Sequence, residues 1–263
     1  MQPLLPLGGY AGWRFLSDSL GAQLERFSQG PVQERDISHF RARIGSVSTP
    51  DQLVSDTRLL RVALGAFGLQ EDLPNRAFIR TVLAEGTTRD DALANRLADT
   101  RYRSFSAAFG FGGPLPPRTT APGFADGIIT RFERQEFERA VGEQSPTLRL
   151  ALTARREIGA IAAARPPDTT AWLTVLGNPP LREVFETALG LPAAIGTLEL
   201  DQQLRSFRAA ADSRLGSADF AAFADPARVE DLLRAFTLRA EARAGPSPLT
   251  PGAAALILLR AGG

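Results

Sequence analysis

The stretch TPDQLVSDTRLLRVALGAFGL (residues 49–69) predicts an amphipathic helix and marks both of its ends. Thr49 and Pro50 form a typical helix start, because threonine caps the first turn and proline fits the first helical position. Apolar side chains then recur at helical spacing on one face; they are Leu53, Leu60, Leu64 and Phe67. Gly68 is suited to end the helix, since glycine readily adopts the left-handed conformation that closes many helices.

The same signals recur along the 263 residues of the chain. Apolar stripes at spacings of three and four predict a first helix around Trp13 to Phe27 and a second around Ile37 to Ile44. Further helix starts are predicted at Asn75, Asp90 or Asp91, Phe124, Ser145, Asp168, Asn178, Leu200 and Asp225. Sustained alternation of β-branched and polar residues is scarce. We therefore predict an all-α fold of roughly ten to twelve helices.

A similar stretch occurs later in the chain, where residues 181–191 read LREVFETALGL and residues 59–69 read LLRVALGAFGL. Five positions are identical at this offset, including the glycine and the leucine that end each stretch. One interpretation is an internal duplication that gives two similar helical halves. The other is that both are ordinary amphipathic helices with a common glycine-and-apolar ending.

The segment GFGGPLPPRTTAPG (residues 110–123) interrupts the helical pattern. Its four prolines and four glycines exclude regular structure and predict a surface loop. We therefore predict an N-terminal helical half at residues 1–109, this loop, a C-terminal half at 124–244, and a tail at 245–263 in which a loop precedes a short apolar stretch. The two halves can also form one compact unit.

Composition excludes several classes of enzyme. The chain has no cysteine, which excludes disulfides, zinc ribbons, iron–sulfur clusters and cysteine nucleophiles. All 30 basic residues are arginine, and without lysine there is no Walker phosphate loop, kinase lysine or Schiff base. A catalytic triad or a histidine metal cluster would have to use His39, the only histidine. We expect a protein that is not an enzyme and that needs no cofactor.

The charge pattern and the hydropathy of the chain limit the kinds of partner and the location that we expect. The 30 basic and 29 acidic residues are interspersed, and this pattern is unlike the basic face of a nucleic-acid binder. No segment approaches the ~20 apolar residues that span a bilayer. The first residues, MQPLLPLGGYAGWRFL, lack the basic and continuous apolar regions of a secretory signal. We expect no nucleic-acid partner and no membrane span, and a location that is cytoplasmic or, through a non-cleaved signal, exported.

Possible catalytic groups have plainer interpretations. His39 would need an orienting carboxylate such as Asp36 or Glu34, but pairing with a local carboxylate on a helix surface is the favoured interpretation. Paired acids lie near helix starts, where carboxylates favour the helix dipole; they are Glu71-Asp72, Asp90-Asp91 and Glu230-Asp231. The G-x-G-G within AAFGFGGP (residues 107–114) follows a helix instead of the strand that a nucleotide loop requires. We predict no catalytic, cofactor-binding or metal-binding residues.

The N-terminal LLPLGGYAGW (residues 4–13) is the candidate for partner binding. It places large apolar side chains in a glycine-punctuated segment, which either docks into a partner or folds back on the protein's own core. The candidate partner-binding residues are Leu4, Leu5, Leu7, Tyr10 and Trp13.

The sequences of several segments resemble those of the bacterial domain-of-unknown-function family 1217. They are PLGGYAGWRFL (6–16), RLLRVALGAFGL (58–69), NRAFIRTVLAEGT (75–87), ALANRLADTRYRSFSAAFGFG (92–112), RQEFERAVGEQ (134–144) and NPPLREVFETALGLP (178–192). The resemblance extends to about residue 240. It carries over no established activity and no catalytic residues. Members of the family occur in alpha-class proteobacteria and are often encoded among flagellar genes, which implies other flagellar proteins as partners.

Three hypotheses follow from the residues and the resemblance. The first is a non-enzymatic protein-interaction factor linked to flagellar assembly or to the basal body. The second is an exported structural component of the flagellum, although the long heptad-patterned terminal helices of axial subunits are missing here. The third is a hydrolase that uses carboxylates alone, which requires a pocket that gathers two or more carboxylates with arginines.

Overall fold

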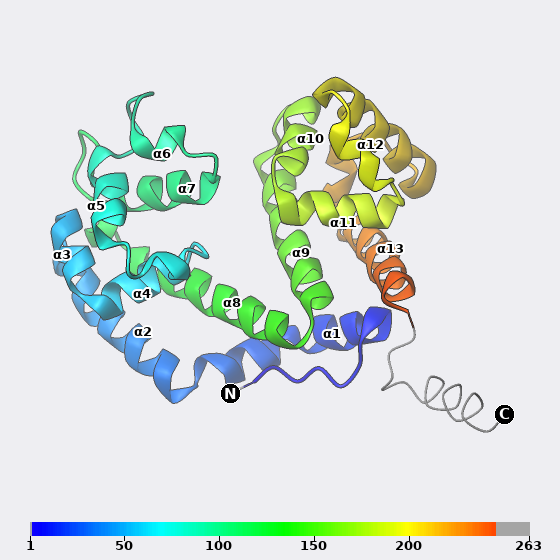
Figure 1. Ribbon diagram of the computed structural model, residues 1–263. Helices are drawn as coiled ribbons and strands as arrows, with labels where there is room; N and C mark the ends of the chain where they lie inside the picture. The colour runs from blue at the N-terminus through cyan, green and yellow to red at the C-terminus, as the bar shows by residue number, and fades with distance from the viewer. Residues whose placement is uncertain (1, 246–263) are drawn as a thin grey trace. The chain divides into compact units, whose positions relative to one another are not determined.

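A computed structural model describes residues 2–245, and this part of the chain forms thirteen α-helices and five short 3₁₀ helices, without strands (Figure 1). The all-α prediction is confirmed. The predicted tail lies outside the described residues except for Gly245. The number of helices exceeds ten to twelve because two of the expected helices are each interrupted.

The first interruption falls within the helix predicted from Thr49. Asp56 has extended backbone angles (φ −94°, ψ 107°) and separates α3 (Pro50–Ser55) from α4 (Thr57–Gly65). Its carboxylate accepts hydrogen bonds from the backbone N–H groups of Arg58 and Leu59, at 2.9 and 3.1 Å. Asp56 therefore starts a new helix instead of continuing the old one, as aspartate does at an N-cap.

The second interruption corrects the cap predicted at Asp90 or Asp91. Neither residue caps a helix, and the carboxylate of Asp91 pairs with Arg89. Two helices follow, α6 (Leu93–Arg96) and α7 (Thr100–Phe109). Asp99 caps the second of them by accepting the N–H of Arg101 at 2.9 Å. The stripe of apolar residues in this region therefore belongs to two separate helices.

The described chain divides into two compact units whose boundaries differ from the predicted halves. Unit 1 contains Leu20–Ala140 and the residues before Leu4, and unit 2 contains Leu4–Ser19 and the chain from Val141 onward. Two helices have residues in both units, α1 (Gly9–Ser28) and α8 (Phe124–Gln144). The 110–123 loop lies inside unit 1, and the division between the units falls after Ala140 instead. Proline and glycine content marked a loop, but this loop does not separate the units.

Unit 1 is built around α4, in which six of the nine residues are buried. Helix α2 (Pro31–Arg43) packs on α4, α3 packs on both α4 and α5 (Arg76–Glu85), and α5 packs on α7. Phenylalanine rings fill the space at one side of this core, with Phe105 and Phe109 5.2 Å apart between their centroids. The remaining short elements are the 3₁₀ helices η1 (Ile44–Ser46), η2 (Gln70–Asp72) and η3 (Arg118–Thr120).

The 110–123 loop is largely exposed, as predicted, but it is anchored at two points. Thr119 is buried, and its hydroxyl donates a hydrogen bond of 2.6 Å to the carbonyl of Val47. Gly112 lies directly against the backbone of Gly86, which ends α5 with φ 69° and ψ −150°. These backbone angles are accessible essentially to glycine alone, and the close approach leaves no room for a Cβ atom at Gly112.

Unit 2 is built around α11 (Pro179–Leu189), which packs against α9, α10, α12 and α13. The bounds of those helices are Pro146–Ala164, Asp168–Leu176, Leu200–Leu215 and Pro226–Ala244. The unit also contains the 3₁₀ helices η4 (Ala193–Thr197) and η5 (Phe220–Ala224). Trp172 is fully buried, and its ring contacts those of Phe185 and Phe220 edge-on at 5.5 Å.

The predicted starts at Ser145, Asn178 and Asp225 are confirmed, because each side chain accepts a backbone N–H of the helix that follows. The start predicted at Asp168 needs a correction. Asp168 is the first residue of α10, and Pro167 occupies the cap position. The carboxylate of Asp168 instead accepts the N–H of Phe220 at 2.7 Å, which is a long-range contact.

The two similar stretches, residues 59–69 and 181–191, begin and end their helices with the same hydrogen bonds. Asp56 and Asn178 each cap the third residue that follows, through the N–H of Leu59 and of Leu181. Gly68 and Gly190 both have left-handed backbone angles, with φ 69° and 58°. The leucine after each glycine donates its N–H to the carbonyl five residues earlier, at 2.9 Å in both cases. This is the Schellman ending, which is common among helices, so its repetition fits both interpretations.

Among the described residues, no helix is both long enough and apolar enough to cross a membrane.

Candidate functional site

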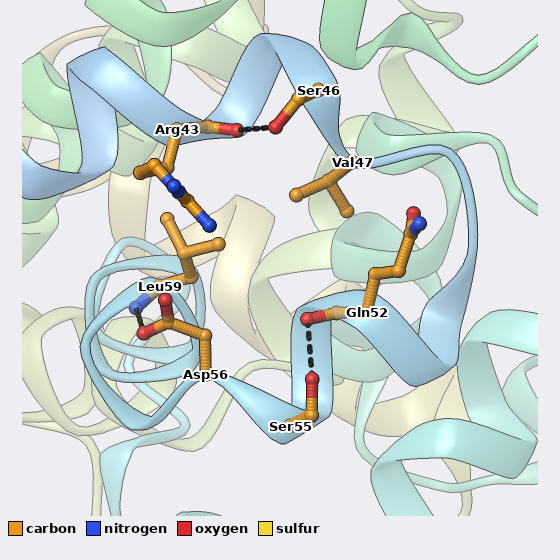
Figure 2. A pocket seen from close by; sticks show the side chains of 7 residues that line it. All are labelled: Arg43, Ser46, Val47, Gln52, Ser55, Asp56 and Leu59. Atoms are coloured by element: carbon orange, nitrogen blue, oxygen red, sulfur yellow. Dashed lines mark hydrogen bonds between the residues drawn. The ribbon is translucent and has the colours of Figure 1, made fainter.

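One candidate site is a pocket of about 440 Å³ in unit 1, at the junction of α2, α3 and α4 (Figure 2). Arg43 lines it from the end of α2, Ser46 from η1, and Val47 from the position directly after η1. The other lining residues come from α3, from the interruption and from α4; they are Gln52, Ser55, Asp56 and Leu59. The pocket therefore sits at the interruption that the sequence did not predict.

The only histidine pairs with Asp56 beside this pocket. His39 Nε2 lies 2.7 Å from the Oδ2 atom of Asp56, while the other carboxylate oxygen caps α4. The carboxylates near it in sequence do not pair with it, and Asp36 is instead bound by Arg61 at 2.8 Å. The favoured prediction, pairing of His39 with a carboxylate, is correct in kind, but the partner lies seventeen residues away.

Hydrogen bonding holds Asp56 ionised. Partial burial raises the pKa of Asp56, but hydrogen bonds from His39 and from the backbone N–H of Leu59 lower it further. The net pKa lies below the ordinary value for an aspartate. An ionised Asp56 is therefore a stronger cap for α4 and a stronger partner for the imidazole of His39.

The other polar groups of the pocket are occupied in holding the helices together. The hydroxyl of Ser46 donates to the carbonyl of Arg43 at 2.8 Å, and that of Ser55 donates to the carbonyl of Gln52 at 3.0 Å (Figure 2). Neither hydroxyl is hydrogen-bonded to His39. A serine nucleophile must be within hydrogen-bonding reach of its base. The arrangement seen here is a helix junction stabilised by polar contacts.

The acidic pairs also have structural partners. Asp72 accepts a hydrogen bond of 2.6 Å from the hydroxyl of Tyr102, and Glu230 accepts one of 2.9 Å from the indole of Trp13. Partial burial and the bond to Asp72 together raise the pKa of Tyr102 to about 12. No group of three or more potential metal ligands occurs within residues 2–245. The G-x-G-G glycines follow α7 at the start of the 110–123 loop, and a helix precedes them, as the sequence indicated.

The N-terminal candidate residues separate into buried and exposed groups. Trp13 is 0% exposed, with its indole bound by Glu230 and the guanidinium of Arg155 5.9 Å from its ring. Tyr10 is half-buried beneath the guanidinium of Arg234, at 5.4 Å. Trp13 thus belongs to the core of unit 2 and is not available to a partner in this structure.

The leucines that precede these anchors are exposed. Leu4 is 59% exposed and Leu7 is 54% exposed, while Leu5 is half-buried. Leu238 of α13 is 46% exposed and shares a helix face with Arg234 and Glu241. Those two residues contact the start of α1 at Tyr10 and Gly9. We call Leu4, Leu7, Tyr10 and Leu238 the α1-start surface.

Sequence reasoning did not single out Leu238. The buried residues of α13 form a clear stripe; they are Val229, Leu232, Leu233, Phe236 and Thr237. Leu238 falls outside that stripe, and a large apolar residue on the polar side of a helix was the available signal. Its proximity to the start of α1 depends on packing between distant segments, which periodicity does not show.

These features define an all-helical protein of two units, each organised around a central capped helix. The chain matches the family described as "Protein of unknown function (DUF1217)" over residues 66–229, and it belongs to that family. It is also similar to a protein from Agrobacterium tumefaciens whose crystal structure was determined by a structural genomics consortium. The two are 29% identical with a TM-score of 0.73, over 94% of this chain and 100% of that one. Comparison with curated proteins gives no match.

Proposed function

We propose that this protein is a non-enzymatic interaction factor that binds another protein through the α1-start surface. The observation that carries the proposal is the exposure of Leu4 and Leu7, just before the firmly held Tyr10 and Trp13, and of Leu238, on the helix whose Arg234 contacts Tyr10. Single exposed leucines are common, but exposed leucines on a short segment and on the helix that contacts the end of that segment favour an interaction surface. Because the anchors already fix the start of α1, binding there has a smaller entropic cost.

We further propose that the partners are other flagellar proteins. The support is the resemblance to a family often encoded among flagellar genes, which is an association and not a physical argument. An exported structural component of the flagellum is the second candidate, and it shares the same surface. The carboxylate hydrolase has less support, because the pocket at the junction of α2, α3 and α4 has Asp56 as its single carboxylate, and a second pocket, in unit 2, has Glu230.

The test is affinity capture of the tagged protein from motile cells, with cytoplasmic and flagellar fractions analysed separately by mass spectrometry. We expect a variant with Leu4→Ser, Leu7→Ser and Leu238→Ser to lose at least tenfold of the flagellar proteins captured by the unmodified chain. The matched control is Leu115→Ser, which removes a leucine that is 76% exposed in unit 1.

Capture of export or motor-switch proteins from the cytoplasm would support an assembly factor. Recovery with hook, rod or ring proteins would support the structural component instead. Undiminished capture by the triple variant would contradict the proposed surface. Unchanged motility and flagellar number after deletion of the gene would contradict the flagellar link.

A further inference from the structure

Two arginines of α13 cover the C-terminal end of α11. Arg239 donates a hydrogen bond to the carbonyl of Ala188, and Arg243, one turn later, donates one of 3.0 Å to the hydroxyl of Thr187. Thr187 and Ala188 belong to the last turn of α11, where backbone carbonyls have no partner inside the helix. Positively charged side chains are favoured at this end of a helix, so these contacts stabilise the end of α11.

A third arginine joins them from α12. A Cβ atom added at Gly190, the residue that closes α11, would lie 3.1 Å from a terminal nitrogen of Arg214. The three side chains also act on one another through their charges. Burial, followed by the neighbouring charges of Arg214 and Arg243, lowers the pKa of Arg239 below the ordinary value for arginine. We call Arg214, Arg239 and Arg243 the arginine cluster.

The positive charge of the arginine cluster is not balanced within the described chain. None of the three guanidiniums forms an ion pair with a carboxylate among residues 2–245. Elsewhere in unit 2 arginines do pair with carboxylates, as Arg182 does with Glu186 at 2.7 Å. The C-terminus of a helix carries only about half an elementary negative charge. Three guanidiniums therefore leave an excess of positive charge at the end of α11.

The arginine cluster is accessible to a partner. Arg214 and Arg243 are exposed, and Arg239 is half-buried. A guanidinium has five N–H groups. Within the described chain, the guanidinium of Arg243 donates one hydrogen bond and that of Arg214 donates none. Most of these donors therefore remain for an acceptor from outside, and a carboxylate matches them well because its two oxygens accept two parallel N–H groups.

We propose that the arginine cluster binds an acidic segment of a partner protein, in which closely spaced aspartate or glutamate side chains meet the three guanidiniums. Charge complementarity carries the proposal, because like charges held together repel one another and carboxylates that bind among them offset this repulsion. Nucleic acid fits less well, since its phosphates are spread along a strand and are met by an extended basic face. The arginine cluster surrounds a single helix end, and the charges of the whole chain are interspersed.

A binding assay on the full chain tests the proposal. The probe is a rhodamine-labelled peptide of six glutamates, and binding is followed by fluorescence anisotropy at low ionic strength, where charge pairing is strongest. We expect the protein to bind this peptide and not the matching peptide of six glutamines. Arg214→Gln combined with Arg243→Gln should weaken the affinity by roughly tenfold or more, because two charge-assisted contacts are lost.

The matched control changes two other exposed arginines of unit 2, Arg149→Gln and Arg205→Gln, and lowers the net charge equally. Arg149 belongs to α9, and Arg205 lies nine residues before Arg214 on α12, about 14 Å along the helix. We expect this control to weaken binding by less than about twofold. The triple serine variant of the α1-start surface should bind the glutamate peptide unchanged, so the two proposals can fail separately.

Circular dichroism shows whether each variant keeps its helix content. If the double variant unfolds, Arg214→Gln alone decides, because the side chain of Arg214 donates no hydrogen bond within the described chain; we expect it to weaken binding about threefold. Equal weakening by the control pair, or no binding of the glutamate peptide, would overturn the proposal. Tighter binding of a labelled oligothymidine, lost in the same double variant, would also overturn it and would assign the arginine cluster to nucleic acid.

Discussion

Gly112→Ala should destabilise unit 1 by about 3 kcal/mol, because the loop after α7 is held against α5 by contact between two backbones. An added Cβ would lie 2.6 Å from the carbonyl carbon of Glu85, and it would lie still closer to the nitrogen of Gly86 and the oxygen of Ala84. Overpacking of a core costs roughly 1–3 kcal/mol. We place this site at the upper end, since backbone atoms yield less than side chains do.

The neighbouring glycine is a matched control. A Cβ at Gly113 would have no neighbour closer than 3.7 Å, and this residue has no left-handed backbone angle. We expect Gly113→Ala to change stability by less than about 0.5 kcal/mol, as is usual for surface substitutions. The same added methyl group, one residue apart, therefore separates the effect of close backbone contact from that of the substitution itself.

The assay is chemical denaturation followed by two probes. Trp13 and Trp172, the only tryptophans, both belong to unit 2. Tryptophan fluorescence therefore reports on unit 2, and far-ultraviolet circular dichroism reports on both units. A loss of 3 kcal/mol lowers the folding equilibrium constant of unit 1 by roughly 150-fold and its Tm by about 10 °C. Equal stabilities of the Gly112→Ala and Gly113→Ala variants by circular dichroism would refute the reasoning.

Three further perturbations follow from the polar contacts. Asp56→Asn should destabilise unit 1 at neutral pH. Folding lowers the pKa of Asp56, so the ionised carboxylate stabilises unit 1 above the unfolded pKa near 4 and stops doing so as the pH falls below it. The difference in the free energy of unfolding between wild type and variant should therefore narrow when denaturation is repeated at lower pH. Tyr102 should ionise at about pH 12 when ultraviolet absorbance is followed in a chain without the other tyrosine. Because folding raises the pKa of Tyr102, its contribution to the stability of unit 1 should be lost between pH 10 and 12. Asp72→Asn should bring the ionisation of Tyr102 to a lower pH. Trp13→Phe should destabilise unit 2 by about 1–2 kcal/mol, because the hydrogen bond to Glu230 is lost. A double-mutant cycle with Glu230→Gln should give a coupling energy of at least 0.5 kcal/mol. Simple additivity of the two substitutions would contradict a specific contact.

Local chemistry made the helices predictable, and long-range contacts limited the accuracy of their ends. Ser145 and Asn178 were recognisable as caps because each is followed by proline and then by an apolar stripe. Asp56 was not recognised, because the apolar spacing continues across it and only its extended backbone reveals the break. Asp168 was predicted to be a helix cap because the nearby sequence shows only its position at a helix start. Its hydrogen bond to the backbone of Phe220, 52 residues away, cannot be read from that sequence.

The same limit applies to the candidate site. Leu4 and Leu7 were identified from their position in an apolar N-terminal segment, and their exposure fits that interpretation. Trp13 was included for the same reason, although its partners on α9 and α13 bury it. Leu238 became apparent only when the packing of α13 against the start of α1 was known. Sequence pattern thus separates helix faces well, but it does not tell which face meets which.

The division of α1 between the two units has a consequence for synthesis on the ribosome. The hydrogen bond between Trp13 and Glu230 cannot form until Glu230, 217 residues later in the chain, has been synthesised. At roughly 5–20 residues per second, that wait is about 10–40 s. During this time unit 1 can complete its fold, whereas the first turns of α1 emerge with their apolar face uncovered. The first turns of α1 are therefore a segment that a chaperone can protect, and their apolar face is covered only after α13 has left the exit tunnel.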